Sequence, residues 1–176
     1  MTLLGLDLSE AYRIPCMLRT TTRVNHSRGP VRFGELPREK PTASFTKDPF
    51  NLVVVPMVGR KLRLALMEKE KMLREEAEKS PFNFVTGQGE NGIITSGVSW
   101  LYVQDALRDL GLEGKVKVLK LGFTHPMPRK LVGNFLRGVG KVLVVEELEP
   151  FLEEAVKGIA QEEEIPVKIV GKGEQW

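Results

Sequence analysis

The chain has 176 residues, of which 41% are hydrophobic and 28% charged, the composition of an ordinary soluble globular protein. This length predicts one domain, or one domain and part of a second. The net charge of +3 is uneven, because residues 1–72 carry 13 basic and 7 acidic side chains whereas residues 73–176 carry 13 and 16. Two bodies of different character are therefore indicated. No basic stripe has aromatic residues interleaved with it, which argues against a nucleic-acid partner.

The single cysteine, Cys16, excludes an internal disulfide and any iron–sulfur cluster held by cysteines of this chain alone. It lies in the apolar run IPCML, which predicts a small buried side chain in a reducing compartment. No apolar run approaches the roughly 20 residues of a membrane span. The N-terminal MTLLGLDLSEAYR has acids where a signal peptide has positive charge. We therefore expect a cytoplasmic protein that makes no membrane contact.

The first 56 residues predict little regular structure. A short helix over 6–13 leads into a strand over 14–20, and a basic loop and a proline-rich stretch (37–51) precede the apolar run LVVVP. One helix and one strand cannot bury a core. We therefore expect the closing part of a larger unit, with an apolar face left bare.

Residues 57–79 predict one long charged helix. Opposite charges stand at the favourable four-residue step in two pairs, Glu70 with Arg74 and Glu75 with Lys79. A modest apolar face is predicted from Leu62, Leu66, Met67 and Leu73. A long polar helix often bridges two bodies, so we interpret 57–80 as a linker.

The remaining residues predict alternating strands and helices. The strands are expected over 92–97, 115–122, 141–147 and 165–171, with an added edge strand in 82–87. Apolar positions at helical spacing separate them: Val103, Ala106, Leu107 and Leu110, then Leu131, Val132, Phe135 and Leu136, then Phe151, Leu152, Ala155, Val156 and Ile159. This alternation predicts an α/β fold, with a parallel sheet covered by helices on both faces.

The loop TTRVNHSRGPV, residues 21–31, is the first candidate site. It follows the predicted strand 14–20, and ligands of open α/β sheets favour the crevice beyond the carboxyl ends of strands. Arginine suits a carboxylate or phosphate, and histidine can move a proton near neutral pH. The candidate substrate-side or interface residues are Arg19, Arg23, His26, Ser27 and Arg28. The alternative is a solvated loop whose arginines contact a neighbouring domain or subunit.

Two glycine-containing stretches allow a binding or a structural interpretation. The turn TSGVS, 95–99, could hold an anion at a helix start, or Ser96 or Ser99 could cap that helix. The stretch GQGENG, 87–92, precedes a strand and does not open a helix. It therefore fails the dinucleotide fingerprint and predicts a turn or hairpin.

The remaining candidates are acids and a histidine. Glu146 and Glu147 end a predicted strand, where they could act as acid and base or, with Glu149, favour a helix N-terminus. His125 lies in the proline-marked loop THPMP, and no ligand stands at metal spacing around it, so a loop role is predicted. We predict no metal ligand in this chain.

Two runs together resemble a known family. The first extends from Leu8-Ser9-Glu10 through IPCMLRTTTRVNHSRG. The second comprises GIITSGVSWLYVQDAL, VLKLGFTHPMPRKLV, KVLVVEELEPFLEE and VKIVGKG. In this order they resemble the alpha subunits of indolepyruvate ferredoxin oxidoreductases, which belong to the thiamine-diphosphate-dependent 2-oxoacid:ferredoxin oxidoreductases. The resemblance covers nearly the whole chain.

The resemblance implies three segments. Residues 1–56 would be the C-terminal remnant of a pyrimidine-binding thiamine diphosphate domain, and 57–80 the linker helix. Residues 81–176 would form a transketolase C-terminal-like domain, a three-layer α/β/α sandwich with a mostly parallel mixed sheet. The implied enzyme decarboxylates aryl 2-oxoacids oxidatively to acyl-CoA, with ferredoxin as electron acceptor.

The implied cofactors are thiamine diphosphate, Mg²⁺ and 4Fe–4S clusters. This chain contains no Gly-Asp-Gly motif and one cysteine, and the family's activating glutamate lies upstream of the matched runs. We therefore expect an internal fragment that is structural, is inactive alone and holds no cofactor or confident catalytic residue. Its partners would be the remaining domains of the alpha subunit, the beta subunit and ferredoxin, and a homodimer is also allowed. The alternative is a stand-alone protein-interaction or small-anion-binding α/β module, whose N-terminal part should be self-sufficient.

Overall fold

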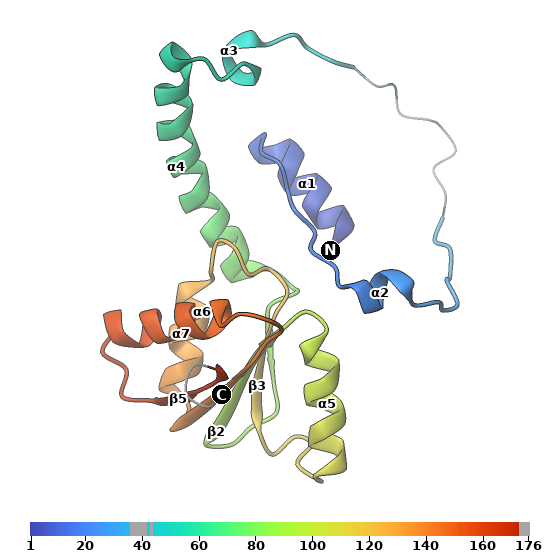
Figure 1. The fold of residues 1–176 in the computed structure, drawn as a ribbon, viewed down its shortest axis with the longest axis vertical. Helices are drawn as coiled ribbons and strands as arrows, with labels where there is room; N and C mark the ends of the chain where they lie inside the picture. The colour runs from blue at the N-terminus through green and yellow to red at the C-terminus, as the bar shows by residue number, and fades with distance from the viewer. Residues whose placement is uncertain (36–41, 43, 173–176) are drawn as a thin grey trace.

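The computed structural model describes residues 1–35, 42 and 44–172, which form an α/β domain and an N-terminal arm (Figure 1). The arm holds α1 (Thr2–Tyr12), α2 (Thr22–His26), α3 (Pro49–Leu52) and the long α4 (Pro56–Lys79). The strands of the domain are β1 (Phe84–Thr86), β2 (Asn91–Ser96), β3 (Lys117–Leu121), β4 (Lys141–Val145) and β5 (Lys168–Val170). Its helices are α5 (Ser99–Asp109), α6 (Arg129–Arg137) and α7 (Phe151–Glu162).

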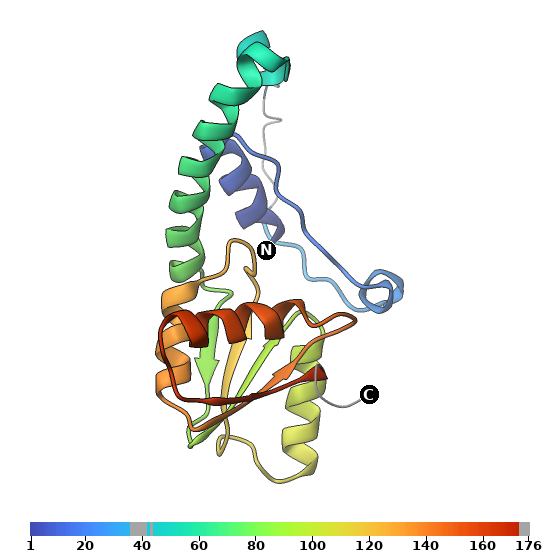
Figure 2. The ribbon, with the colours of Figure 1, turned by 60° about the vertical axis from the view of Figure 1, so that its left-hand side comes forward.

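The five strands form one mixed sheet in the order β1-β3-β2-β4-β5. Strands β2 to β5 run parallel, and β1 pairs antiparallel with β3 at the edge. The helix α5 covers one face while α6 and α7 cover the other, which Figure 1 and Figure 2 show from two sides. The predicted alternation, the edge strand in 82–87 and the three-layer, mostly parallel fold are therefore confirmed.

The larger of two apolar clusters lies between the sheet and the helices α6 and α7. Its fully buried members include Ile94, Leu119, Leu136, Val142 and Val156. A second, smaller cluster under α5 contains Val103, Leu107 and Val118. Buried β-branched and leucine side chains on both faces are what parallel strands require, because helices cover each face.

Several residues expected on buried helix faces are exposed. In α5 the buried hydrophobic residues are Val103 and Leu107, four residues apart, and Ala106 is exposed. Leu110 is 70% exposed because the helix ends at Asp109. Phe151 is 75% exposed at the first position of α7, where the buried face begins one residue later.

The long charged helix predicted over 57–79 is confirmed as α4, which begins one residue earlier, at Pro56. Its C-terminal end packs on the domain through the buried Leu73 and Ala77. Leu66 and Met67, predicted on the same apolar face, are 42% and 45% exposed, because this half of α4 extends beyond the α/β domain (Figure 2).

Two predictions for the arm are wrong. Residues 14–20 do not form a strand, because no strand in the described parts of the chain lies beside them to pair with. Cys16 is exposed, since this run crosses the surface and enters no core. The first helix spans Thr2–Tyr12, where 6–13 was predicted, and the loop after residue 20 contains the short helix α2.

The arm closes no core of its own. Leu8 is the one buried hydrophobic residue among the described residues of 1–56, whereas Leu3, Met17 and Phe33 are more than three-quarters exposed. The bare apolar surface expected from the sequence is therefore present. Part of the predicted proline-rich stretch, 37–41 and 43, lies outside the described residues.

None of the helices within the described residues combines the length and apolar character needed to span a lipid bilayer. The longest, α4, carries charged side chains along its length.

Candidate functional site

A crevice of about 510 Å³ lies at the carboxyl ends of the parallel strands. Its floor is made by residues that end or follow β2, β3 and β4, including Ser96, Leu121 and Glu146. Because α5 follows β2 on one face of the sheet and α7 follows β4 on the other, the connections diverge between these neighbouring strands. Such a switch point is where open α/β sheets bind ligands.

The N-terminal arm supplies one wall of this crevice. Met17, Leu18, Arg19 and Thr21 line it, although they are about a hundred residues from the strands they approach. Of the predicted loop only Thr21 lines the crevice, because Met17, Leu18 and Arg19 belong to the run predicted as a strand. The sheet edge that they meet is that of the C-terminal domain, whereas the prediction assumes a strand formed by residues 14–20.

The structure separates the five candidate residues. Arg19 lines the crevice, and the guanidinium carbon of Arg23 lies 5.7 Å from the centre of the Tyr102 ring on α5. His26 ends α2, where the Ser27 hydroxyl donates to the Val24 carbonyl at 2.8 Å. Arg28 follows on the exposed chain. Of the five, only Arg19 therefore lines the crevice.

Glu146 serves as a helix-capping acid. Its carboxylate accepts hydrogen bonds from the backbone N–H groups of Leu152 and Glu153, at 2.8 and 2.9 Å, in the first turn of α7. The helix-terminus interpretation is therefore confirmed for this residue, because both of its oxygens are engaged. Glu147 lines the crevice and is exposed.

The turn between β2 and α5 has no side-chain cap. Gly97 adopts a φ of +57°, Val98 occupies the capping position, and Ser99 is the first helical residue with 4% exposure. The prediction that Ser96 or Ser99 caps this helix is therefore wrong, since the glycine turn places Ser99 inside the helix. An anion at this turn stays a prediction.

The stretch GQGENG forms the predicted turn. Gly87 has a φ of +68°, and a Cβ there would overlap the carbonyl oxygen of Val116, so only glycine fits. The turn is not a hairpin, because β3 lies between the two strands that it joins.

Lys120 and His125 add titratable groups to the crevice. Burial lowers the pKa of Lys120, whose ammonium group donates to the Phe82 carbonyl at 3.3 Å and lies 5.7 Å from the centre of the Phe84 ring. His125 is exposed in the loop after β3, as predicted. Arg19 and Lys120 thus place two basic side chains in the crevice, which the acids Glu146 and Glu147 also line.

Asn83 is a site-forming residue that sequence reasoning missed. Its side-chain oxygen accepts from the N–H groups of Gly122 and Phe123, both at 2.8 Å, and its amide donates to the carbonyls of Ala77 and Phe123 at 2.8 and 3.1 Å. It thereby fixes the end of β3 at the crevice against the end of α4. A lone asparagine after a helix carries no sequence signal of such a role.

Within residues 1–35, 42 and 44–172, no group of three or more histidine, cysteine, aspartate or glutamate side chains is arranged to hold a metal ion. The side chains that line the crevice offer charge and hydrogen bonds.

Comparisons with known proteins bear on more than half of the chain. A family model described as the indolepyruvate oxidoreductase domain matches residues 85–175. The indolepyruvate oxidoreductase subunit IorA of Thermococcus kodakarensis is 45% identical, over 98% of this chain and 28% of that protein. The subunit IorA of Methanothermobacter marburgensis is 47% identical, over 96% of this chain and 27% of that protein. The chain thus spans little more than a quarter of the length of these relatives.

Two solved structures show partial similarity. An inactive split-gene transketolase tetramer matches 51% of this chain and 31% of its own, with 29% identity and a TM-score of 0.43. A 2-oxoglutarate:ferredoxin oxidoreductase from Magnetococcus marinus matches 66% of this chain and 20% of its own, with 22% identity and a TM-score of 0.47.

Proposed function

Because the chain belongs to the family of the indolepyruvate oxidoreductase domain, we propose that it is part of the alpha subunit of an indolepyruvate ferredoxin oxidoreductase. The complete enzyme oxidatively decarboxylates aryl 2-oxoacids to acyl-CoA and passes the electrons to ferredoxin. The observation that carries this proposal is 45% identity to an IorA subunit over 98% of the chain. The activity belongs to the longer protein, since the matched stretch is 28% of that relative.

Thiamine diphosphate, Mg²⁺ and 4Fe–4S clusters would be the cofactors of that longer protein. The residues present here do not fit a complete site for them, because the described residues hold no metal-binding group and the sequence has no Gly-Asp-Gly motif. We therefore assign no reaction step to this chain and place these groups in the parts of the relatives outside the alignment.

The role of this chain would be architectural. Residues 1–56 would complete a pyrimidine-binding domain, 57–80 would connect it, and 81–176 would be the transketolase C-terminal-like domain. The exposed apolar side chains of the arm support this division, because Phe50, Val54 and Met57 are 76%, 76% and 88% exposed and need covering. The remaining alpha-subunit domains would cover them, and a beta subunit, ferredoxin and a second copy of the subunit would be further partners.

Of the five candidate residues, we propose that Arg19 acts on the substrate side or at an interface with a neighbouring domain or subunit. It alone among the five lines the crevice. The exposed Cys16 thiol supports a reducing, cytoplasmic location.

A segment exchange tests the proposal. The stretch of the Thermococcus kodakarensis subunit that matches this chain is replaced by residues 1–176, and indolepyruvate- and CoA-dependent reduction of ferredoxin is measured. We expect the hybrid subunit to be active and this chain alone to be inactive. A matched hybrid carrying Leu119→Asp, at a position with 0% exposure, should lose activity through loss of the fold. A hybrid that folds and assembles but oxidises no aryl 2-oxoacid would contradict the proposal, as would activity of the chain alone.

A small-anion-binding module is the second candidate. It is favoured by the uncapped start of α5, which faces the same crevice as Arg19 and Lys120. Calorimetric titration of the isolated chain with inorganic phosphate separates the enzyme-fragment proposal from the anion-binding module. Saturable binding that is lost in Arg19→Gln would support the module.

A further inference from the structure

The root of α4 is built into the α/β domain. Leu73, Ala77 and Ser80 are 5%, 0% and 6% exposed there, whereas Met57 at the far end is 88% exposed. Figure 2 shows α4 rising from the domain as a single helix. The direction of α4 is therefore decided by contacts at its last two turns.

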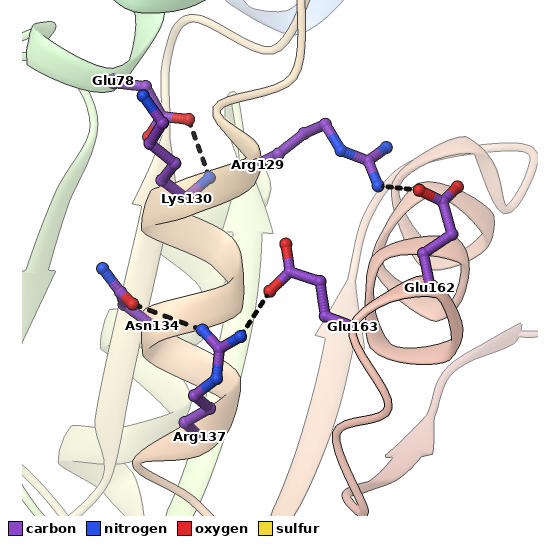
Figure 3. A network of polar contacts seen from close by, with 7 residues as sticks. All are labelled: Glu78, Arg129, Lys130, Asn134, Arg137, Glu162 and Glu163. Atoms are coloured by element: carbon purple, nitrogen blue, oxygen red, sulfur yellow. Dashed lines mark hydrogen bonds and ion pairs between the residues drawn. The ribbon is translucent and has the colours of Figure 1, made fainter.

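The N-terminus of α6 provides the decisive contact. Pro128 occupies the capping position of this helix and makes no side-chain cap. Glu78 of α4 supplies the cap instead, because its two carboxylate oxygens accept from the N–H groups of Lys130 and Leu131, both at 2.8 Å. Figure 3 shows the Glu78 side chain over the first turn of α6. These donors have no partner within their own helix, and the helix dipole favours a negative charge beside them.

Asn83 also holds the end of α4, through the Ala77 carbonyl, but it joins α4 to the end of β3 and does not reach α6. The remaining ion pairs around this joint are exposed or tie other elements. The Lys130 ammonium lies 2.7 Å from Glu75, but the two side chains are 70% and 52% exposed, where an ion pair contributes little. The pairs Arg129–Glu162 and Arg137–Glu163 connect α6 to the end of α7 and do not touch α4 (Figure 3).

We propose that Glu78 is a positioning residue, whose carboxylate on the N-terminus of α6 fixes the direction in which α4 leaves the α/β domain. Met57 lies 21 residues before Glu78, a lever of about 30 Å, so a tilt of about 10° at the joint moves its end by about 5 Å.

The end of α1 is hydrogen-bonded to α4. The Tyr12 hydroxyl donates to Glu76 at 3.1 Å, and the Lys69 ammonium donates to the Arg13 carbonyl at 3.2 Å. The segment that begins at Arg13 then runs to Arg19 at the crevice. Glu78 thus holds the wall of the crevice in place from a distance, although it contacts no residue of that wall.

Distances between two spin labels test the proposal in the full chain. The labels replace Met57 on α4 and Leu101 on α5, which are 88% and 58% exposed, in a background with Cys16→Ser. We expect a narrow distance distribution in this background and a broadened or shifted one in Glu78→Gln. The readout is a distance, so it holds whether or not the longer protein oxidises 2-oxoacids.

Glu146→Gln is the matched control. Glu146 caps α7 by the same two-oxygen arrangement in the same domain, but it does not touch α4. It should lower the unfolding temperature as much as Glu78→Gln does while leaving the distance distribution unchanged. Hydrogen exchange of the backbone amides confirms that each cap is lost. Lys130 and Leu131 should lose protection in Glu78→Gln, and Leu152 and Glu153 should lose protection in Glu146→Gln.

An unchanged distribution in Glu78→Gln overturns the proposal, and so does equal broadening in Glu146→Gln. If Glu78→Gln does not fold, Glu78→Asp replaces it, because the shorter side chain keeps the charge but cannot reach both N–H groups. An unchanged distribution in that variant likewise overturns the proposal.

Discussion

Replacement of Asn83 by alanine is the sharpest test of how the crevice is held. The side chain is 8% exposed and makes four hydrogen bonds, two to N–H groups and two to carbonyls. Each net hydrogen bond contributes about 1 kcal/mol, and water can replace part of the three that are only partly buried, so we expect a loss of about 2–4 kcal/mol. For a chain of this length that loss lowers Tm by roughly 5–12 °C.

The assay is urea unfolding followed by circular dichroism, with the free energy taken by linear extrapolation. Asn134→Ala is the control, because this exposed asparagine accepts one long hydrogen bond, at 3.4 Å, and should change stability by less than about 0.5 kcal/mol. Asn83→Asp keeps the acceptor but places an oxygen where the amide donates to Ala77 and Phe123, so it should also be destabilising. A loss below about 1 kcal/mol in Asn83→Ala, or wild-type stability in Asn83→Asp, would refute the reasoning.

Three further predictions concern the core, one ion pair and the thiol. Leu119→Ala, at 0% exposure, should cost about 2–5 kcal/mol, whereas Leu64→Ala, at 59% exposure, should change the free energy of unfolding by less than about 0.5 kcal/mol; equal losses would contradict the burial pattern. The hydrogen bond and charge of Lys130 lower the pKa of Glu75 below its usual 4.5, so this pair stabilises the fold above that pH and the contribution is lost as pH falls. The difference in urea midpoint between wild type and Glu75→Gln should therefore be small at pH 7 and decrease as the pH falls below 4.5. A difference that grows on acidification would contradict this prediction. The exposed Cys16 thiol should react with Ellman's reagent in the native state as fast as in urea. Slower reaction in the native state would instead support the buried position predicted from the sequence.

The α/β domain was predictable because each element carries its own periodicity. The strand β4 contains the apolar run VLVV, three of whose residues are β-branched, and the helix after it places Leu152, Val156 and Ile159 on one side. Burial against a sheet with two covered faces requires apolar residues at regular positions in each element. That pattern can be read from the residues of the element alone. The family resemblance, stated from the order of the motifs, is confirmed by the match over 85–175.

The candidate site was predictable only in part. Arg19 was named on the assumption that residues 14–20 form a strand, yet it reaches the crevice from an unpaired segment. Strand formation needs a partner, and a local pattern cannot say whether one is present. For Glu146, the sequence allows an acid–base role and a helix-terminus role, of which the second is the plainer. The position of α7 decided between them, because its first N–H groups lie within hydrogen-bond distance of the carboxylate.

Local chemistry in this chain thus decides which segments become helices and strands, and which faces of the domain are apolar. The direction of α4, the cap that Glu78 places on α6 and the wall that Arg19 gives to the crevice join residues about 50 to 130 positions apart. Such contacts leave no periodic trace, because a single carboxylate or guanidinium at one position satisfies them. They come into being only when packing of the sheet and helices brings the two ends together.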